Sequence, residues 1–214
     1  MKLTLSLILI NVLGFFYSLT DFENIISSYA FNPIKFLHGE HYRIITSMFL
    51  HANFLHLAFN MLALFILGSA IEKKINGLKY FIVYTIGGVG SNLIMMVPLF
   101  FSPESMGVGA SGAISAVIGL GTFYSPGKFV SFPTFIPIPF VISGAFYFIT
   151  QYMNLFAPSQ IAYPVHLFGM LIGSIFGLIW VKGRINKIVI FLLALILVII
   201  FPYIIKYVIM SFIK

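Results

Sequence analysis

The stretch Tyr163–Val181, YPVHLFGMLIGSIFGLIWV, decides the fold class of this chain. Its length suits an α-helix that crosses the hydrocarbon core of a bilayer, which needs about 20 predominantly apolar residues. Gly169, Gly173 and Gly177 recur at every fourth position and therefore form one glycine face, which lets a neighbouring helix approach closely. We predict a membrane-spanning helix that packs tightly against another helix and carries His166 near its beginning.

Six further apolar runs accompany this segment, at about 3–19, 54–72, 78–100, 109–124, 138–153 and 186–212. Of the 214 residues, 60% are hydrophobic and 8% are charged, whereas soluble domains carry about 25% charged residues. The sequence therefore predicts an all-α, polytopic helical bundle in a lipid bilayer, without a separate soluble domain. No small-residue cleavage site follows the first run, so we interpret it as a retained helix rather than a signal peptide.

Two connections between the runs have an unusual composition. Residues 20–53 mix charged, histidine and apolar residues over a long distance, and we expect short amphipathic helices there, in the membrane interface. Residues 129–139 contain Pro133, Pro137 and Pro139. Prolines at that density cannot lie inside a regular helix, so we expect the next helix to begin near Ile138.

The net charge of +7 comes from 12 Lys and Arg against 5 Asp and Glu. Most basic residues lie in short connections, which is typical of topology determinants rather than of a nucleic-acid surface, and no nucleic-acid partner is expected. If the N-terminus is cytoplasmic, the basic residues on the inner side are Lys2, Lys73, Lys74, Lys79, Lys128, Lys182, Arg184 and Lys187. This bias favours a cytoplasmic N-terminus, which places Ser111, His166 and His56 near the outer ends of their helices.

The stretch Gly109-Ala110-Ser111-Gly112 lies at the predicted start of an apolar helix. A serine hydroxyl becomes a good nucleophile when a base takes its proton, and the free backbone N–H groups at a helix start can stabilise an oxyanion. The flanking glycines let a substrate backbone approach closely. The alternative is helix packing alone, because Gly112 begins a small-residue face that continues through Ala116.

Three other polar side chains lie on apolar runs. His166 is suited to act as a general base near neutral pH, and His56 and Asn60 share one helical face because they are four residues apart. His56 and Asn60 could donate hydrogen bonds to a developing oxyanion. The alternative is that these two residues and His166 serve only as polar contacts between helices. No acid is placed to complete a triad, so the residues favour a Ser111–His166 dyad and peptide hydrolysis inside a membrane.

Other catalytic classes find less support in the sequence. HExxH is absent, and the spacing of His51 and His56 points them to different faces. Asp21, the one aspartate, lies in a loop, which argues against an aspartyl intramembrane protease; the count of 0 Cys excludes thiolate metal sites. We expect no metal and no cofactor. Glu72 is expected to have a structural role, and Arg43 to anchor the first outer loop through backbone carbonyls or lipid phosphates.

As a set, these motifs resemble the rhomboid intramembrane serine proteases, over about residues 1–181. The matching segments occur in the family's order: 41–51 around Arg43, His56–Asn60 (HxxxN), Gly68–Glu72 (GxxxE), Gly109–Gly112 (GxSG), Ile136–Pro139 and His166–Gly169, which begins HxxGxxxG. The resemblance implies a six-helix catalytic core over residues 1–181 and an additional C-terminal transmembrane helix over residues 182–214.

The resemblance also implies roles for the matching residues. Ser111 would be the nucleophile and His166 the general base, while His56, Asn60 and the Ser111 backbone N–H would form the oxyanion hole. Supporting positions would be Gly109, Gly112, Gly169, Arg43 and Glu72. Substrates would be other transmembrane proteins, cut near the outer membrane face, and no cofactor is implied. The small size and the lack of a targeting extension favour a prokaryotic cell membrane.

The sequence departs from the family pattern at two notable positions. Tyr42 replaces the usual Trp before Arg43, and Ser115 replaces the aromatic residue that commonly stacks on the catalytic histidine. The second change would leave His166 less restrained and could lower activity. The alternative function is a catalytically weak or inactive rhomboid-like protein that binds client transmembrane helices. A transporter would show inverted repeats or charges at the midplane, and neither is evident here.

Overall fold

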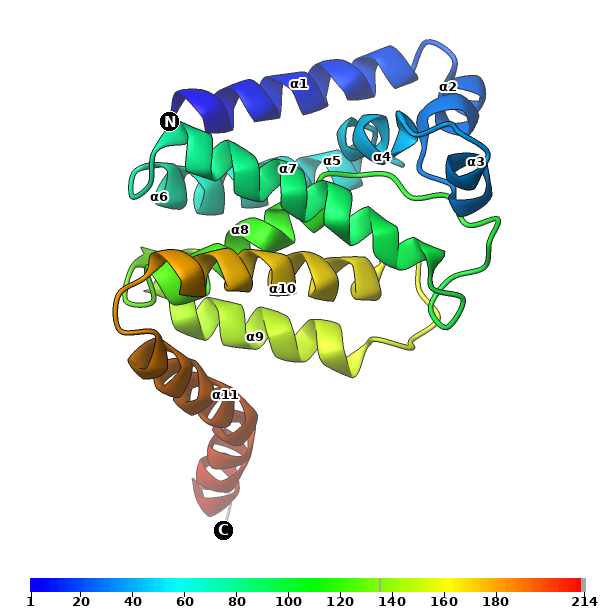
Figure 1. The fold of residues 1–214 in the computed structure, drawn as a ribbon. Helices are drawn as coiled ribbons and strands as arrows, with labels where there is room; N and C mark the ends of the chain where they lie inside the picture. The colour runs from blue at the N-terminus through cyan, green and yellow to red at the C-terminus, as the bar shows by residue number, and fades with distance from the viewer. Residues whose placement is uncertain (135, 213–214) are drawn as a thin grey trace.

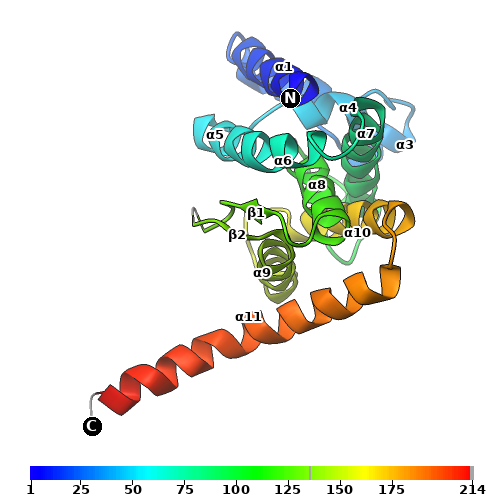
Figure 2. The same cartoon turned by 90° about the vertical axis from the view of Figure 1, so that its left-hand side faces the viewer.

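Helix α8 (Ser111–Tyr124) lies at the centre of the molecule. The computed structural model describes the backbone of residues 1–134 and 136–212, and the side chains among them up to residue 205. Every residue of α8 from Gly112 to Phe123 is buried. Figure 2, which looks roughly along the bundle, shows α8 surrounded by α5 (Phe54–Ala63), α7 (Gly77–Leu93), α9 (Phe140–Met153) and α10 (Tyr163–Trp180).

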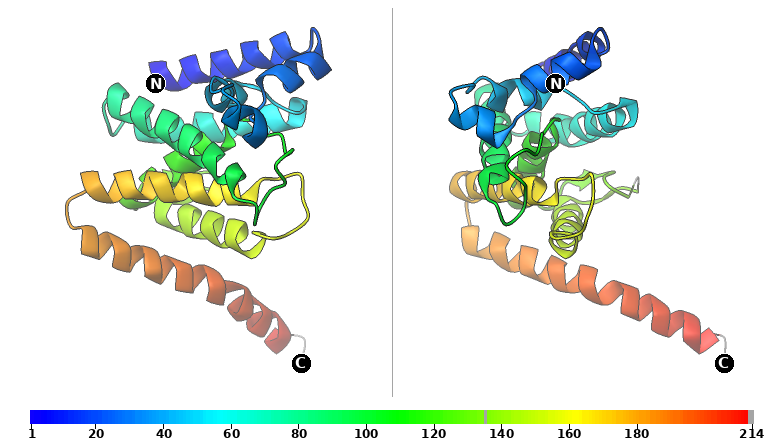
Figure 3. Two further views of the ribbon diagram at one scale, coloured as in Figure 1. Left: turned by 45° about the vertical axis from the view of Figure 1, so that its right-hand side comes forward. Right: turned by 90° about the vertical axis from the view of Figure 1, so that its right-hand side faces the viewer.

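The outer helices complete an all-α bundle, as predicted. Helix α1 (Lys2–Ser18) lies on the outside, along the span formed by α5, a π-helical turn at Leu64–Gly68 and α6 (Ser69–Glu72) (Figure 1). At the other side, α11 (Arg184–Phe212) extends away from the bundle at an angle (Figure 3). Ala194 of α11 packs against Val141 and Ala145 of α9.

Each predicted apolar run contains a helix. Among the described residues, the segments Phe54–Glu72, Tyr163–Trp180 and Arg184–Ile205 are helices long and apolar enough to cross a membrane. Helices α1, α8 and α9 are apolar but shorter. With about 1.5 Å of rise per residue, the 14 residues of α8 extend about 21 Å, less than the roughly 30 Å of a hydrocarbon core. At least one end of α8 therefore lies within the depth of the bilayer.

The contact between α8 and α10 depends on glycines in both helices. A Cβ added at Gly169 would overlap the carbonyl oxygen of Gly112, and one added at Gly173 would overlap that of Ala116. The two backbones therefore pass each other without intervening side chains, which is the close approach predicted from the glycine spacing. This packing fixes the position of His166 on α10 relative to Ser111 on α8.

The long first connection folds into short helices, as expected. These are α2 (Phe22–Tyr29), α3 (Pro33–Leu37), α4 (Arg43–Thr46) and a 3-10 turn at Ser47–Phe49. Asn92 of α7 holds the connection against the bundle, because its buried amide donates to the Ile44 carbonyl at 3.0 Å and to the Ser47 hydroxyl at 3.1 Å. The connection is thus a packed part of the structure.

Two helix boundaries differ from the expected ones. The run at 78–100 is helical only to Leu93, followed by a 3-10 turn at Ile94–Met96, because Pro98 disfavours a helical conformation for the residue before it, and Val97 is extended. In the proline-rich connection, β1 (Phe129–Val130) pairs antiparallel with β2 (Ile138–Pro139). Helix α9 consequently begins at Phe140 rather than at Ile138.

Candidate active site

Ser111 is the first residue of α8, so the backbone N–H groups of the first turn lack helical partners. The preceding chain is turned sharply at Gly109, which has a φ of +118°, a conformation that favours glycine. The N–H of Gly109 donates to the Ser47 carbonyl at 2.9 Å, which ties this turn to the first connection. The Ser111 hydroxyl therefore lies beside a cluster of available backbone donors.

The Ser111 hydroxyl and the His166 imidazole are in hydrogen-bond contact. The distance from Ser111 Oγ to His166 Nε2 is 2.8 Å. His166 lies in the first turn of α10, whose second residue is Pro164, and the glycine packing of α10 on α8 brings the two side chains together. This is the geometry that a serine nucleophile and its general base require.

His56 and Asn60 face the same backbone turn. Asn53 caps α5 by accepting from the His56 backbone N–H at 2.8 Å, which places His56 in the first helical turn. A Cβ built on Gly109 would lie 2.8 Å from His56 Nε2 and 3.5 Å from Asn60 Nδ2. Asn60 Nδ2 is buried and has no hydrogen-bond partner among the described residues. Since buried donors are almost always paired, a free donor beside Ser111 suits a site that receives an external acceptor.

Three residues near the dyad were not foreseen in these roles. Gln151 of α9 places its Oε1 atom 3.0 Å from His166 Nδ1. Ser115 donates to the Ser111 carbonyl at 2.7 Å and shares a 2.6 Å hydrogen bond with the Tyr147 hydroxyl. Tyr147 and Gln151 are four residues apart on an apolar helix, so they share one polar face. Polar groups inside a span usually mark function, and that signal was available in the sequence.

The remaining predicted supporting residues have structural contacts. Arg43, which is 3% exposed, donates to the carbonyls of Ser27 at 2.9 Å and Ala30 at 3.0 Å. Glu72 lies at the opposite end of its span from His56, where its carboxylate accepts from the N–H groups of Leu3 and Thr4, each at 2.9 Å. Glu72 therefore caps the start of α1, away from Ser111.

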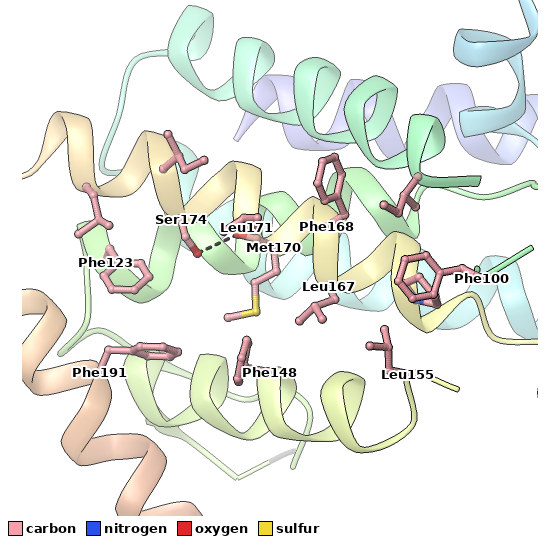
Figure 4. A pocket seen from close by; sticks show the side chains of 14 residues that line it. Phe100, Phe123, Phe148, Leu155, Leu167, Phe168, Met170, Leu171, Ser174 and Phe191 are labelled. Atoms are coloured by element: carbon pink, nitrogen blue, oxygen red, sulfur yellow. Dashed lines mark hydrogen bonds between the residues drawn. The ribbon is translucent and has the colours of Figure 1, made fainter. Parts of the chain in front are cut away.

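An apolar cavity of about 430 Å³ lies between α9, α10 and α11 (Figure 4). Phe148, Leu167, Met170 and Phe191 are among its lining side chains, and the Ser174 hydroxyl there donates to the Met170 carbonyl at 2.8 Å. Neither Ser111 nor His166 lines it. The cavity offers no free group for covalent chemistry, so the dyad rather than the cavity is the candidate active site.

Comparison with known proteins identifies the family. Residues 38–183 match the Rhomboid domain, and the chain belongs to the rhomboid family of integral membrane proteins. The chain is 33% identical over 142 residues to Rhomboid protease AarA of Providencia stuartii, covering 57% of this chain and 50% of that protein. It is 37% identical over 87 residues to Putative rhomboid protease YdcA of Bacillus subtilis, covering 40% of this chain and 42% of the relative.

A plant relative shows a longer but weaker match. RHOMBOID-like protein 12, mitochondrial, of Arabidopsis thaliana is 26% identical over 166 residues, covering 70% of this chain and 49% of the relative. The alignments thus cover about half or less of each of these relatives. Family membership rests on the domain match, which contains Ser111, His166, His56 and Asn60.

Proposed function

We propose that this protein is an intramembrane serine endopeptidase that uses Ser111 and His166 as a catalytic dyad. The observation that carries the proposal is the 2.8 Å contact between Ser111 Oγ and His166 Nε2 at the N-terminus of a buried helix. The rhomboid proteases among its relatives support the same reaction class. Substrates are the transmembrane segments of other membrane proteins.

The reaction proceeds in two steps. Ser111 Oγ attacks the carbonyl carbon of the scissile peptide bond while His166 Nε2 takes the hydroxyl proton. His166 then returns that proton to the leaving amine, and an ester of Ser111 remains. In the second step His166 removes a proton from water, whose oxygen attacks the ester carbonyl carbon. The ester bond then breaks, His166 returns the proton to Ser111 Oγ, and the acid product leaves.

The tetrahedral intermediate of each step carries a negative charge on oxygen. The Ser111 backbone N–H, His56 and Asn60 donate hydrogen bonds to that oxygen. The unpaired, buried Asn60 Nδ2 atom supports this assignment, because a donor that is already fixed in place stabilises developing charge without further reorganisation. His56 Nε2 and Asn60 Nδ2 approach Gly109 from the same side, two residues before the nucleophile.

Cleavage is expected near the outer membrane face. The predicted cytoplasmic N-terminus puts the dyad toward the outer ends of α8 and α10, and the short α8 leaves room for water to reach Ser111 from that side. The location proposed with this orientation is a prokaryotic cell membrane.

The test is proteolysis by the full chain, purified and reconstituted into liposomes. Single-span fusion proteins serve as substrates, and mass spectrometry locates the cut. Wild type and the control Ser6→Ala, which changes an exposed serine on α1, should cleave the span near its outer end. Ser111→Ala and His166→Ala should not cleave. Cleavage by purified Ser111→Ala would overturn the assignment of Ser111 as the nucleophile. Cleavage confined to the cytoplasmic end of the substrate span would overturn the proposed orientation of the protein in the membrane.

A further inference from the structure

The imidazole of His166 is held from both sides. Its Nε2 atom faces Ser111 Oγ of α8 at 2.8 Å, and its Nδ1 atom faces Gln151 Oε1 of α9 at 3.0 Å. Gln151 is 7% exposed, so water has little access to compete for this contact. His166 therefore bridges two helices through its two ring nitrogens.

The neighbouring residues orient the Gln151 amide. The Thr150 hydroxyl donates to the Tyr147 carbonyl at 2.8 Å, which leaves its oxygen as an acceptor. Gln151 Nε2 donates to that oxygen at 3.3 Å. The amide nitrogen of Gln151 is thus directed to Thr150, and its carbonyl oxygen is directed to His166.

This orientation determines which nitrogen of His166 carries the proton. A carbonyl oxygen only accepts, so Nδ1 must donate, and in the neutral ring Nε2 then has a free lone pair. That lone pair points at the Ser111 hydroxyl and can take its proton. In the opposite tautomer Nε2 would carry a proton and could not act as a base toward Ser111.

We infer that Gln151 is a positioning residue, which holds His166 in the orientation and tautomer that activate Ser111; this inference rests on the proposed function. The third side chain of a serine protease site commonly has this role, and here a neutral amide supplies it. Neutrality suits the location, because an ionised carboxylate on a buried, membrane-embedded face would have a large desolvation cost. The contact also makes the geometry of the dyad depend on the position of α9.

The kinetic test compares Gln151→Met with Gln151→Glu in liposomes. Methionine keeps the length of the side chain but does not offer the carbonyl acceptor. We therefore expect kcat to fall about 10- to 100-fold, which is part of the 10²–10⁴-fold rate acceleration that general-base catalysis supplies. KM should change less than twofold. Glutamate, held as a neutral carboxylic acid by burial at this position, keeps a carbonyl acceptor and should recover most of kcat. Tyr152→Phe, which changes the exposed neighbouring residue, is the control and should behave as wild type.

A spectroscopic measurement gives a readout that does not depend on turnover. With ¹⁵N-labelled histidine in detergent-solubilised protein, the His166 signals are assigned by their loss in His166→Ala. Wild type should show a protonated Nδ1 and an unprotonated Nε2, and Gln151→Met should populate the other tautomer. An unchanged tautomer together with wild-type kcat in Gln151→Met would overturn the inference. A wild type that cleaves no substrate would instead overturn the proposed function, and the tautomer would still decide the role of Gln151.

Discussion

The hydroxyl groups of Ser115 in α8 and Tyr147 in α9 share a hydrogen bond of 2.6 Å. Ser115 uses its own proton to reach the Ser111 carbonyl at 2.7 Å, so Tyr147 is the donor in this pair. The Tyr147 ring lies 6.5 Å from the His166 ring, centroid to centroid, at an interplanar angle of 32°. The aromatic neighbour of His166 therefore comes from α9, and the small Ser115 makes room for it.

Removing either hydroxyl of this pair should weaken the contact between α8 and α9. Ser115→Ala leaves the Tyr147 hydroxyl buried without its acceptor, and we expect a loss of about 1–3 kcal/mol in unfolding free energy, whereas Tyr147→Phe should cost about 1 kcal/mol. The double variant should lose less than the sum, because the second change removes a group that is already unpaired. Denaturant unfolding in detergent measures the unfolding free energies of wild type, the two single variants and the double variant. If the losses of the single variants add up to the loss of the double variant, the two hydroxyls do not interact.

Placing an aromatic residue at position 115 should lower activity rather than raise it. The resemblance to the family alone predicts that Ser115→Phe would restrain His166, because an aromatic residue commonly stacks on the histidine from this position. In the structure Ser115 is completely buried, and its site is enclosed by Tyr147 and the close approach of Gly169. A phenyl ring would displace Tyr147 and separate α8 from α9. We expect a fall in both the cleavage rate in liposomes and the melting temperature, and a faster, equally stable variant would refute this packing.

The sequence predicted the helices well because bilayer-spanning segments must be apolar and of sufficient length. The residue chemistry predicted a Ser111–His166 dyad, whereas the glycine face of 163–181 predicted a close neighbouring helix without identifying which one. The contacts of Gln151 with His166 and of Tyr147 with Ser115 were not predicted, because a contact between side chains of different helices depends on the rotation of each helix about its axis. The end of α7 at Leu93 and the pairing of β1 with β2 likewise depend on local proline effects that hydrophobicity does not reveal.

The glycine contact between α8 and α10 should tolerate no added methyl group. A Cβ at Gly173 would overlap the Ala116 carbonyl oxygen, which belongs to the backbone and cannot rotate away. We expect Gly173→Ala to lose about 1–3 kcal/mol of stability and to lose cleavage activity as the dyad separates. Gly77→Ala is the matched control, since nothing lies within 4 Å of a Cβ built there. Equal melting temperatures for the two variants would contradict the packing.

The ion pair between Arg43 and Glu40 should make the first connection sensitive to acid. Glu40 accepts from Arg43 Nε at 2.8 Å, and the hydrogen bonds from Arg43 and then Tyr42 hold its pKa below the ordinary value of 4.5. A carboxyl with a lowered pKa stabilises the fold above its unfolded pKa, and the contribution disappears as the pH falls through the folded value.

Thermal unfolding of Glu40→Gln beside wild type measures this contribution. Wild type should be the more stable of the two at neutral pH, and the difference should be constant down to about pH 5 and shrink toward zero below about pH 4. Glu104→Gln, which changes an exposed carboxylate, is the control and should show no such trend. A difference that grows on acidification would have the wrong sign for this ion pair.

Activation of Ser111 by His166 can be measured directly by covalent labelling. Purified, detergent-solubilised protein is treated with a fluorophosphonate probe, and the modified residue is identified by mass spectrometry of peptides. We expect an adduct on Ser111 in wild type, and no adduct in folded Ser111→Ala or His166→Ala. An adduct on another serine, equal labelling of His166→Ala, or no labelling of folded wild type would contradict this expectation.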